Sequence, residues 1–148
     1  MGKVIVEKQA DVKNLNQLFW ATVQKAIASH RCDVRVASAF RSYAKQAYLY
    51  ALFLAGLGNP ANRPGTSLHE LGLATDLHPV DGDYSALADT MRSIGLATVG
   101  SKEPWHWQGD KAFFAQVARV IVFPFGFMAM SGVIVYLVWK YSKTVQTV

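Results

Sequence analysis

The pattern of hydrophobic residues in the first third of the chain predicts a helix followed by a strand. From Leu15 to Ile27 the large apolar residues recur every three or four positions, which predicts a helix that buries one face. Asn14 lies at the start of this run and is a residue type that caps helices. From Val34 to Ala39 the valines alternate with other residues, so we predict a short strand there.

A second predicted helix is followed by turn-forming residues and then by shorter elements. It extends from Ser42, a capping residue type, to about Leu57, and the sequence GLGNPANRPG at 56–65 ends it. Further elements are predicted as a strand over Gly72–Leu77, a helix over Tyr84–Ile94, and short strands around Ala97 and Trp105. Together they predict one α+β domain over residues 1–109, a small antiparallel sheet with flanking helices.

The C-terminal part of the chain is apolar on every face. Residues 120–139 read VIVFPFGFMAMSGVIVYLVW, without a single charge, and Arg119 and Lys140 flank them. A run of about 20 apolar residues is long enough to cross roughly 30 Å of membrane hydrocarbon as a helix. We therefore predict a juxtamembrane helix over 110–119, one transmembrane helix over 120–139 and a short basic tail over 140–148. A buried core helix is the alternative.

Composition narrows the partners and the covalent chemistry. Hydrophobic residues make up 51% of the chain and charged residues 17%, which agrees with a lipid membrane as one partner. The net charge of +5 is mild and scattered, so we expect no nucleic-acid partner. Cys32 is the single cysteine, which excludes an intrachain disulfide and a thiolate metal cluster. The first residues carry charges throughout, so we expect no signal peptide.

Two histidines lie in short segments that also contain a carboxylate. His69 precedes Asp76 in the sequence SLHELGLATD, and Glu103 precedes His106 in EPWHW. Two imidazoles and one carboxylate would give zinc three protein ligands and leave its fourth position open for water, as a catalytic zinc site requires. A further carboxylate is then needed to take the proton of that water. Glu103 is the natural candidate, because it lies three residues from a ligand.

Spacing alone leaves this metal site an open question. His69 and Asp76 are seven positions apart, so one regular strand would point them to opposite faces, although Gly72 offers a place to bend. Glu103 and His106 are three positions apart and present the same difficulty. The alternative is that both histidines are ordinary surface residues.

Three motifs follow one another in a fixed order. They are SAFRS at 38–42, with Gln46 beyond it; SxHxxGxAxD from Ser67 to Asp76; and EPWH at 103–106. In this order they resemble the zinc D-Ala-D-Ala carboxypeptidases of the VanY type, whose fold is shared with D-Ala-D-Ala dipeptidases and with L-alanyl-D-glutamate endopeptidases of phage lysins. Ala39 and Phe40 depart conservatively from the family's Ser-Gly-Tyr-Arg-Ser segment. The resemblance covers residues 34–109, and the 26 residues between the last two motifs indicate a trimmed version of the fold.

The resemblance implies a set of functional residues. The implied zinc ligands are His69, Asp76 and His106, the implied base is Glu103, the implied oxyanion-stabilising residue is Arg41, and Ser67 would contact the substrate. Glu70 also lies beside a ligand, but we interpret it as a solvated surface residue. No family role is carried onto His78.

The implied function is a zinc-dependent peptidoglycan peptidase that cleaves stem peptides containing D-amino acids, in the manner of a D-Ala-D-Ala carboxypeptidase. The alternatives are an L-Ala-D-Glu endopeptidase and a non-catalytic, membrane-tethered protein that binds the cell wall. A wall hydrolase must face outward, yet positive charges flank the apolar span on both sides and do not fix its orientation. A phage lysis or entry protein carried in a virion membrane, or translocation directed by the anchor itself, would resolve this.

Overall fold

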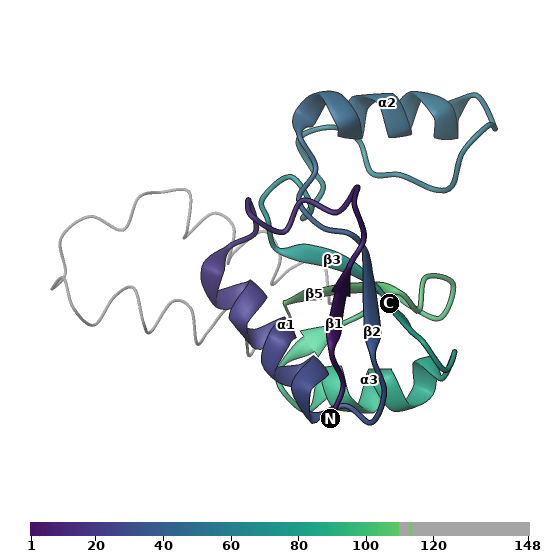
Figure 1. Cartoon of the computed structure of the whole chain (residues 1–148). Coiled ribbons are helices and arrows are strands. Elements are labelled where there is room, and N and C mark those ends of the chain that lie inside the picture. The colour runs from purple at the N-terminus through teal and green to yellow at the C-terminus, as the bar shows by residue number, and fades with distance from the viewer. Residues whose placement is uncertain (110–112, 114–148) are drawn as a thin grey trace, which may run out of the picture.

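The computed structural model describes residues 1–109 and Phe113, and Figure 1 shows a sheet with helices on both sides. In chain order the elements are β1 (Val4–Val6), α1 (Gln17–Ser29), β2 (Val34–Ser38), α2 (Tyr43–Leu54), β3 (Ala74–Pro79), α3 (Tyr84–Arg92), β4 (Leu96–Ala97) and β5 (His106–Gly109). The α+β class is confirmed, and every predicted element over residues 15–109 has a counterpart. Strand β1 is the element that the sequence analysis missed.

The sheet has five strands in the order β1-β2-β3-β5-β4. Four of the strands form antiparallel pairs, as predicted, but β1 runs parallel to β2. The prediction of a purely antiparallel sheet is therefore wrong at this edge. The reason is that α1 lies between β1 and β2 in the chain and supplies the crossover that a parallel pair needs.

The helix caps agree only in part with the prediction. The cap of α1 is Asn16, whose side-chain oxygen accepts a hydrogen bond from the backbone N–H of Phe19 at 3.1 Å. Asn14, the predicted cap, instead donates its side-chain amide to Asp11 at 2.7 Å. Ser42 caps α2 as predicted. Both Asn14 and Asn16 carry a capping side chain, and the position of the first helical turn decides which one acts.

The core lies between one face of the sheet and helices α1 and α3. The buried side chains come from both helices and from four strands: Phe19, Val23, Ala26, Ile27, Val34, Val36, Leu77, Leu87, Met91, Leu96 and Trp107. Because side chains alternate along a strand, burial of Leu77 and Trp107 on this face puts their neighbours Asp76 and His106 on the other one. The helices α1 and α3 thus leave the opposite face of the sheet available for a site.

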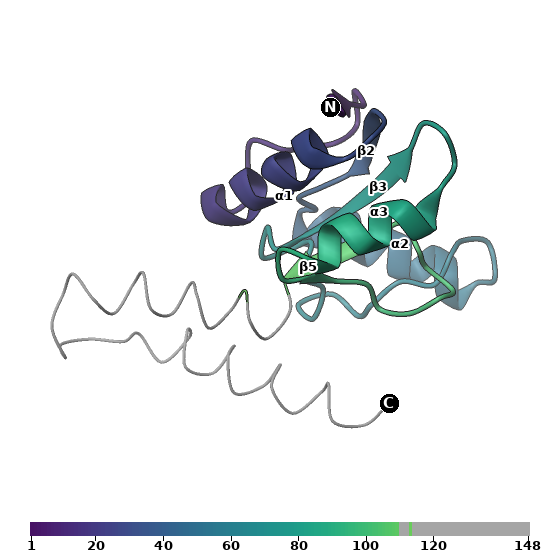
Figure 2. The ribbon, with the colours of Figure 1, turned by 90° about the horizontal axis from the view of Figure 1, so that it is seen from below.

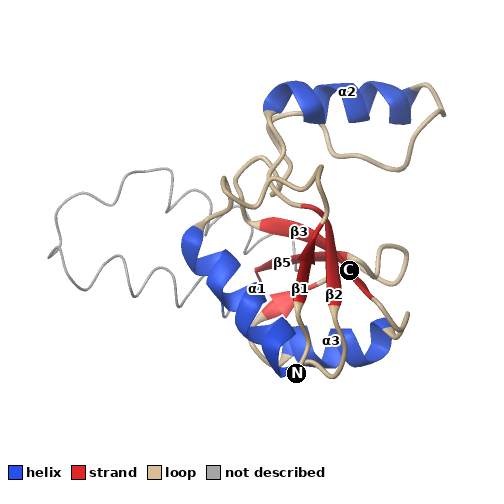
Figure 3. Cartoon of the chain, viewed as in Figure 1, coloured by secondary structure: helices blue, strands red, loops and turns tan. Residues whose placement is uncertain are grey.

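Helix α2 stands apart from this core. In Figure 1 it lies above the sheet while α3 lies below, and the view from below in Figure 2 places α3 in front of α2. A short segment over residues 39–42 leads from β2 into α2, and a long loop over residues 55–73 leads from α2 to β3 (Figure 3). Its single buried residue is Gln46, whereas Tyr43, Leu54 and the following Leu57 are exposed.

The predicted membrane segment lies outside the described residues. Of the predicted segments over 110–119, 120–139 and 140–148, only Phe113 is described, and its ring packs edge-on against Phe19 with centroids 5.9 Å apart. In the part of the chain that the structure describes, no helix has the length and apolar character needed to cross a membrane.

Candidate active site

Asp76 and His106 are brought together by the pairing of two central strands. They are register partners on the antiparallel strands β3 and β5, so their side chains project from the same face of the sheet. The difficulty raised by the spacing of Glu103 and His106 disappears, because Glu103 lies before β5 in a turn closed by a hydrogen bond from His106 N–H to Glu103 O at 3.1 Å.

His69 reaches the same place from a turn and not from a strand. Strand β3 begins only at Ala74, and Gly72 reverses the chain with a φ of +67°. A Cβ atom on Gly72 would lie 2.8 Å from the carbonyl oxygen of Asn14, so only glycine fits there without movement. The seven-residue spacing is therefore compatible with convergence, since the bend at Gly72 separates His69 from the strand.

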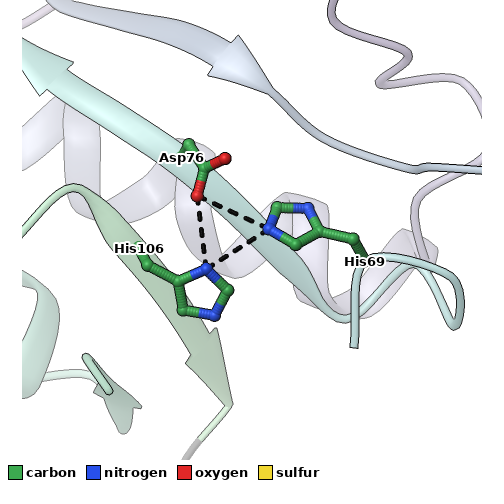
Figure 4. Close-up of side chains that lie close together, drawn as sticks. All are labelled: His69, Asp76 and His106. Atoms are coloured by element: carbon green, nitrogen blue, oxygen red, sulfur yellow. Dashed lines mark hydrogen bonds and ion pairs between the residues drawn. The ribbon is translucent and has the colours of Figure 1, made fainter. Parts of the chain in front are cut away.

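The three side chains meet at their ligand atoms (Figure 4). His69 Nε2 lies 3.4 Å from Asp76 Oδ1 and 3.3 Å from His106 Nδ1, and His106 Nδ1 lies 3.2 Å from Asp76 Oδ1. One nitrogen or oxygen from each residue falls within 4.8 Å of the others, an arrangement that could hold a metal ion. The structure thus unites the three predicted ligands.

The ring nitrogen of each histidine that points away from the cluster also has a polar partner. The backbone carbonyl of Ala39 can only accept, so His69 Nδ1–H donates to it at 2.6 Å and leaves the lone pair of a neutral ring on Nε2. That lone pair faces the carboxylate of Asp76, an arrangement that a cation between them would stabilise. His106 Nε2 lies 3.2 Å from Gln108 Oε1, which fixes the orientation of the second ring.

The electrostatics favour a neutral His69 beside an ionised Asp76. Burial lowers the pKa of His69, and the nearby charge of Asp76 only partly opposes this. Burial alone would raise the pKa of Asp76, but the close contacts with His106 and His69 and the charge of Arg41 hold it well below its ordinary value. These are the protonation states in which imidazole and carboxylate bind metals.

Arg41 contacts the cluster directly and is itself tightly held. Its guanidinium donates to Asp76 Oδ2 at 2.7 Å, to Ser38 Oγ at 3.0 Å and to Gln46 Oε1 at 3.5 Å. Gln46 is fully buried and its amide donates in turn to the carbonyl of Asn62 at 2.7 Å. Arg41 is thus anchored between β2, α2 and the loop that follows α2.

A pocket of about 860 Å³ opens over the cluster, and the other two predicted residues, Glu103 and Ser67, line it. One wall is apolar and comes from α2, with Leu49, Leu52 and Phe53. The remaining lining residues come from the cluster and from three loops: Arg41, Gly58, Asn59, Pro60, Ala61, Asn62, Ser67, His69, Asp76, Val99, Lys102, Glu103, Trp105 and His106. All six predicted site residues therefore face one pocket.

Two residues have structural roles that the sequence analysis missed. Glu70 is partly exposed and has a structural role: it accepts hydrogen bonds from the backbone N–H groups of Gly65 and Ser67 at 2.9 and 3.3 Å. The Ser-x-x-Glu pattern of a capping box was present in the sequence and could have revealed this. His78 binds Tyr84 Oη at 2.6 Å and stacks on Trp105, which supports one side of the pocket.

Comparison with known proteins identifies the family of the chain. The family model described as "VanY: D-alanyl-D-alanine carboxypeptidase" matches residues 9–99, more than half of the chain. The chain belongs to the VanY family. It is therefore a metallopeptidase, as predicted, and the matched residues include Arg41, Ser67, His69 and Asp76. No curated protein matches the sequence.

Solved structures share the VanY fold. The LD-carboxypeptidase LdcB is 25% identical, with a TM-score of 0.50, over 74% of this chain and 72% of its own. A structure of VanYB in complex with D-alanine-D-alanine is 19% identical, with a TM-score of 0.52, over 96% of this chain and 89% of its own. A vancomycin-resistance D,D-pentapeptidase VanY in complex with Zn(II) is 23% identical, with a TM-score of 0.50, over 64% and 72%.

Proposed function

We propose that this chain is a zinc-dependent peptidoglycan peptidase that releases D-alanine from stem peptides ending in D-Ala-D-Ala. The observation that carries the proposal is the convergence of His69, Asp76 and His106 in a pocket that also contains the carboxylate of Glu103. The family to which the chain belongs is described by the same activity.

The donor set suits zinc. Two imidazole nitrogens and one carboxylate oxygen are the ligands of many catalytic zinc sites, and the carbonyl of Ala39 presents His69 with its Nε2 lone pair toward the cluster. His69, Asp76 and His106 would hold the ion, which when bound polarises a carbonyl group and lowers the pKa of water. A homologous VanY structure contains Zn(II).

Glu103 is the residue to which we assign the proton transfer. Among the described residues, its side chain has no ion pair and no hydrogen bond, although it lines the same pocket as the three ligands. Its carboxylate is therefore free to accept a proton from the attacking water and to transfer it to the leaving amine of D-alanine.

Arg41 is the residue to which we assign stabilisation of negative charge on the scissile carbonyl oxygen. A guanidinium has five N–H donors, and three of them are engaged with Asp76, Ser38 and Gln46. The remaining two can donate to the oxygen as charge develops on it, from a group whose orientation is already fixed. Ser67 is 3% exposed and lines the pocket, where it would contact the bound peptide.

The polarity of the pocket supports a peptide substrate with small apolar side chains. The wall formed by Leu49, Leu52 and Phe53 suits the methyl groups of alanine, and the polar cluster opposite suits a peptide bond. L-Ala-D-Glu endopeptidase action is the alternative, and the two activities are distinguished by whether free D-alanine is released from a muropeptide.

The variant Glu103→Gln tests the assignment of the base. With zinc bound, the full chain is expected to release D-alanine, and the variant is expected to lose activity by about 10²- to 10⁴-fold, the usual contribution of general acid–base catalysis. Metal content should stay at one zinc ion per chain, because Glu103 is not a ligand. Glu7→Gln, directly after the edge strand β1 and outside the pocket lining, is the matched control. Full activity in Glu103→Gln would contradict the role of Glu103.

We also propose that residues 120–139 anchor the enzyme in a membrane, with its N-terminal domain facing the cell wall. The support is the uncharged, twenty-residue apolar sequence with a cation on either side. A phage lysis or entry enzyme carried in a virion membrane is one setting for such an arrangement.

A further inference from the structure

Two cationic side chains line the pocket, and they differ in what they contact. In the part of the chain that the structure describes, these are Arg41 and Lys102. Arg41 is largely buried and donates to three side chains, including Asp76. Its charge is therefore already paired with Asp76, and these three hydrogen bonds fix its position.

Lys102 is in the opposite situation. It lies on the loop before β5, next to Glu103, and is exposed to solvent at the pocket. Among the described residues, neither a salt bridge nor a side-chain hydrogen bond involves its ammonium group. Lys102 is thus a cation in the pocket wall whose pairing capacity is unused.

A peptidase that releases a C-terminal residue must accommodate a negatively charged carboxylate close to its catalytic carboxylate. In this pocket that group would lie near Glu103 and against apolar side chains such as Val99 and Trp105. A carboxylate is costly to place there unless a cation pairs with it. An endopeptidase has no such need, because its substrate presents a neutral amide at the same point.

We propose that Lys102 binds the free C-terminal carboxylate of the substrate and so restricts the enzyme to removal of the last residue. This inference rests on the proposed function and deepens it, since it names the group that selects exopeptidase action. Lys102 is adjacent in sequence to Glu103, so the site that recognises the carboxylate and the group that moves the proton belong to one loop. A free ammonium group on a flexible side chain suits a point-charge contact of this kind.

A pair of synthetic peptides tests the inference. Both end in D-Ala-D-Ala, one with a free carboxylate and the other with a C-terminal amide, and kcat and KM are measured with the zinc-loaded full chain. Wild type is expected to prefer the free acid by at least 10-fold in kcat/KM. Lys102→Met is expected to raise KM for the acid about 10-fold, with kcat and the amide reaction unchanged, so that the preference disappears. Lys102→Arg should restore most of the preference.

Lys45→Met is the matched control, because Lys45 lies on α2 over the ring of Tyr48 and not in the pocket lining. Equal zinc content and thermal unfolding of all variants would show that the fold is intact. The acid-to-amide ratio is measured within each variant, so a smaller amount of folded enzyme does not change it.

If wild type turns over neither peptide, the proposed function itself fails. If wild type cleaves the acid but Lys102→Met keeps the same acid preference, or if wild type shows no preference, the role of Lys102 is overturned while the peptidase assignment stands.

Discussion

At the scale of single residues, Arg41 connects the predicted metal ligands to the rest of the pocket. Its planar guanidinium contacts Asp76, Ser38 and Gln46 in three directions, which one ammonium group cannot reproduce. The site therefore needs more than a positive charge at position 41. The planar guanidinium also orients the two N–H groups that remain free to bind the substrate.

The variant Arg41→Lys is accordingly expected to lower kcat by about 10²- to 10³-fold, comparable with the loss of one oxyanion donor. Zinc content is expected to be unchanged, because the three ligands remain. Steady-state kinetics on a D-Ala-D-Ala peptide, together with metal analysis, provide the measurement. Arg35→Lys is the control, since Arg35 lies exposed on β2 and its contact is a distant 3.7 Å pair with Glu7. A variant with wild-type kcat would show that Arg41 serves only to hold Asp76.

At the scale of elements, the turn at Gly72 determines whether His69 reaches the sheet. Gly72→Ala is expected to lower the free energy of unfolding by more than the roughly 1–2 kcal/mol that a left-handed φ costs an L-residue, because the new Cβ also meets the backbone of Asn14 and Asn16. Gly82→Ala is the matched control, with a φ of +76° and nothing within 4 Å of the added carbon.

Urea unfolding of the two zinc-free variants measures this difference. The expected result is a larger loss for Gly72→Ala than for Gly82→Ala, together with weaker zinc binding in Gly72→Ala alone. Equal losses would mean that the segment around Asn14 moves freely out of the way.

The elements also show why some features could be predicted and others could not. Hydrophobic spacing predicted α1, because its buried face produces a periodic signal. Strand β1 has only three residues, and Ile5 and Val6 are exposed, so its pairing with β2 depends on tertiary contacts that leave no periodicity. The seven-residue spacing of His69 and Asp76 did not by itself predict a shared metal site, because the bend at Gly72 that brings them together depends on tertiary contacts. The order of the three motifs along the chain was the stronger evidence for the site.

At the scale of the whole molecule, membrane attachment rests on the sequence of residues 120–139. The full chain, expressed in cells, is expected to stay with the membrane fraction after alkaline extraction. A charge at the middle of the span, as in Val133→Arg, costs about 2.5–3.5 kcal/mol for membrane insertion and should shift much of the chain to the soluble fraction. Val80→Arg is the control, because Val80 is 57% exposed in the catalytic domain. Retention of Val133→Arg in the membrane at the wild-type level would contradict a spanning role.

The orientation is tested by protease protection. Added to intact spheroplasts, a protease is expected to digest the N-terminal domain if it faces the wall, and detergent should make no further difference. Protection of the domain until detergent is added would place it on the inner side and would exclude direct action on the wall in that cell.

Helix α2 forms one wall of the pocket while it buries only Gln46. During evolution, substitutions of Leu49, Leu52 and Phe53 on this helix would change the shape of the pocket at little cost to folding, because the core lies elsewhere. Substitutions in strands β3 and β5 are more constrained, because these strands carry Asp76 and His106 on one face and core residues on the other. Substrate range can therefore diverge among descendants of this sequence through α2 and its loops, under weak stability constraint, while the chemistry is inherited unchanged.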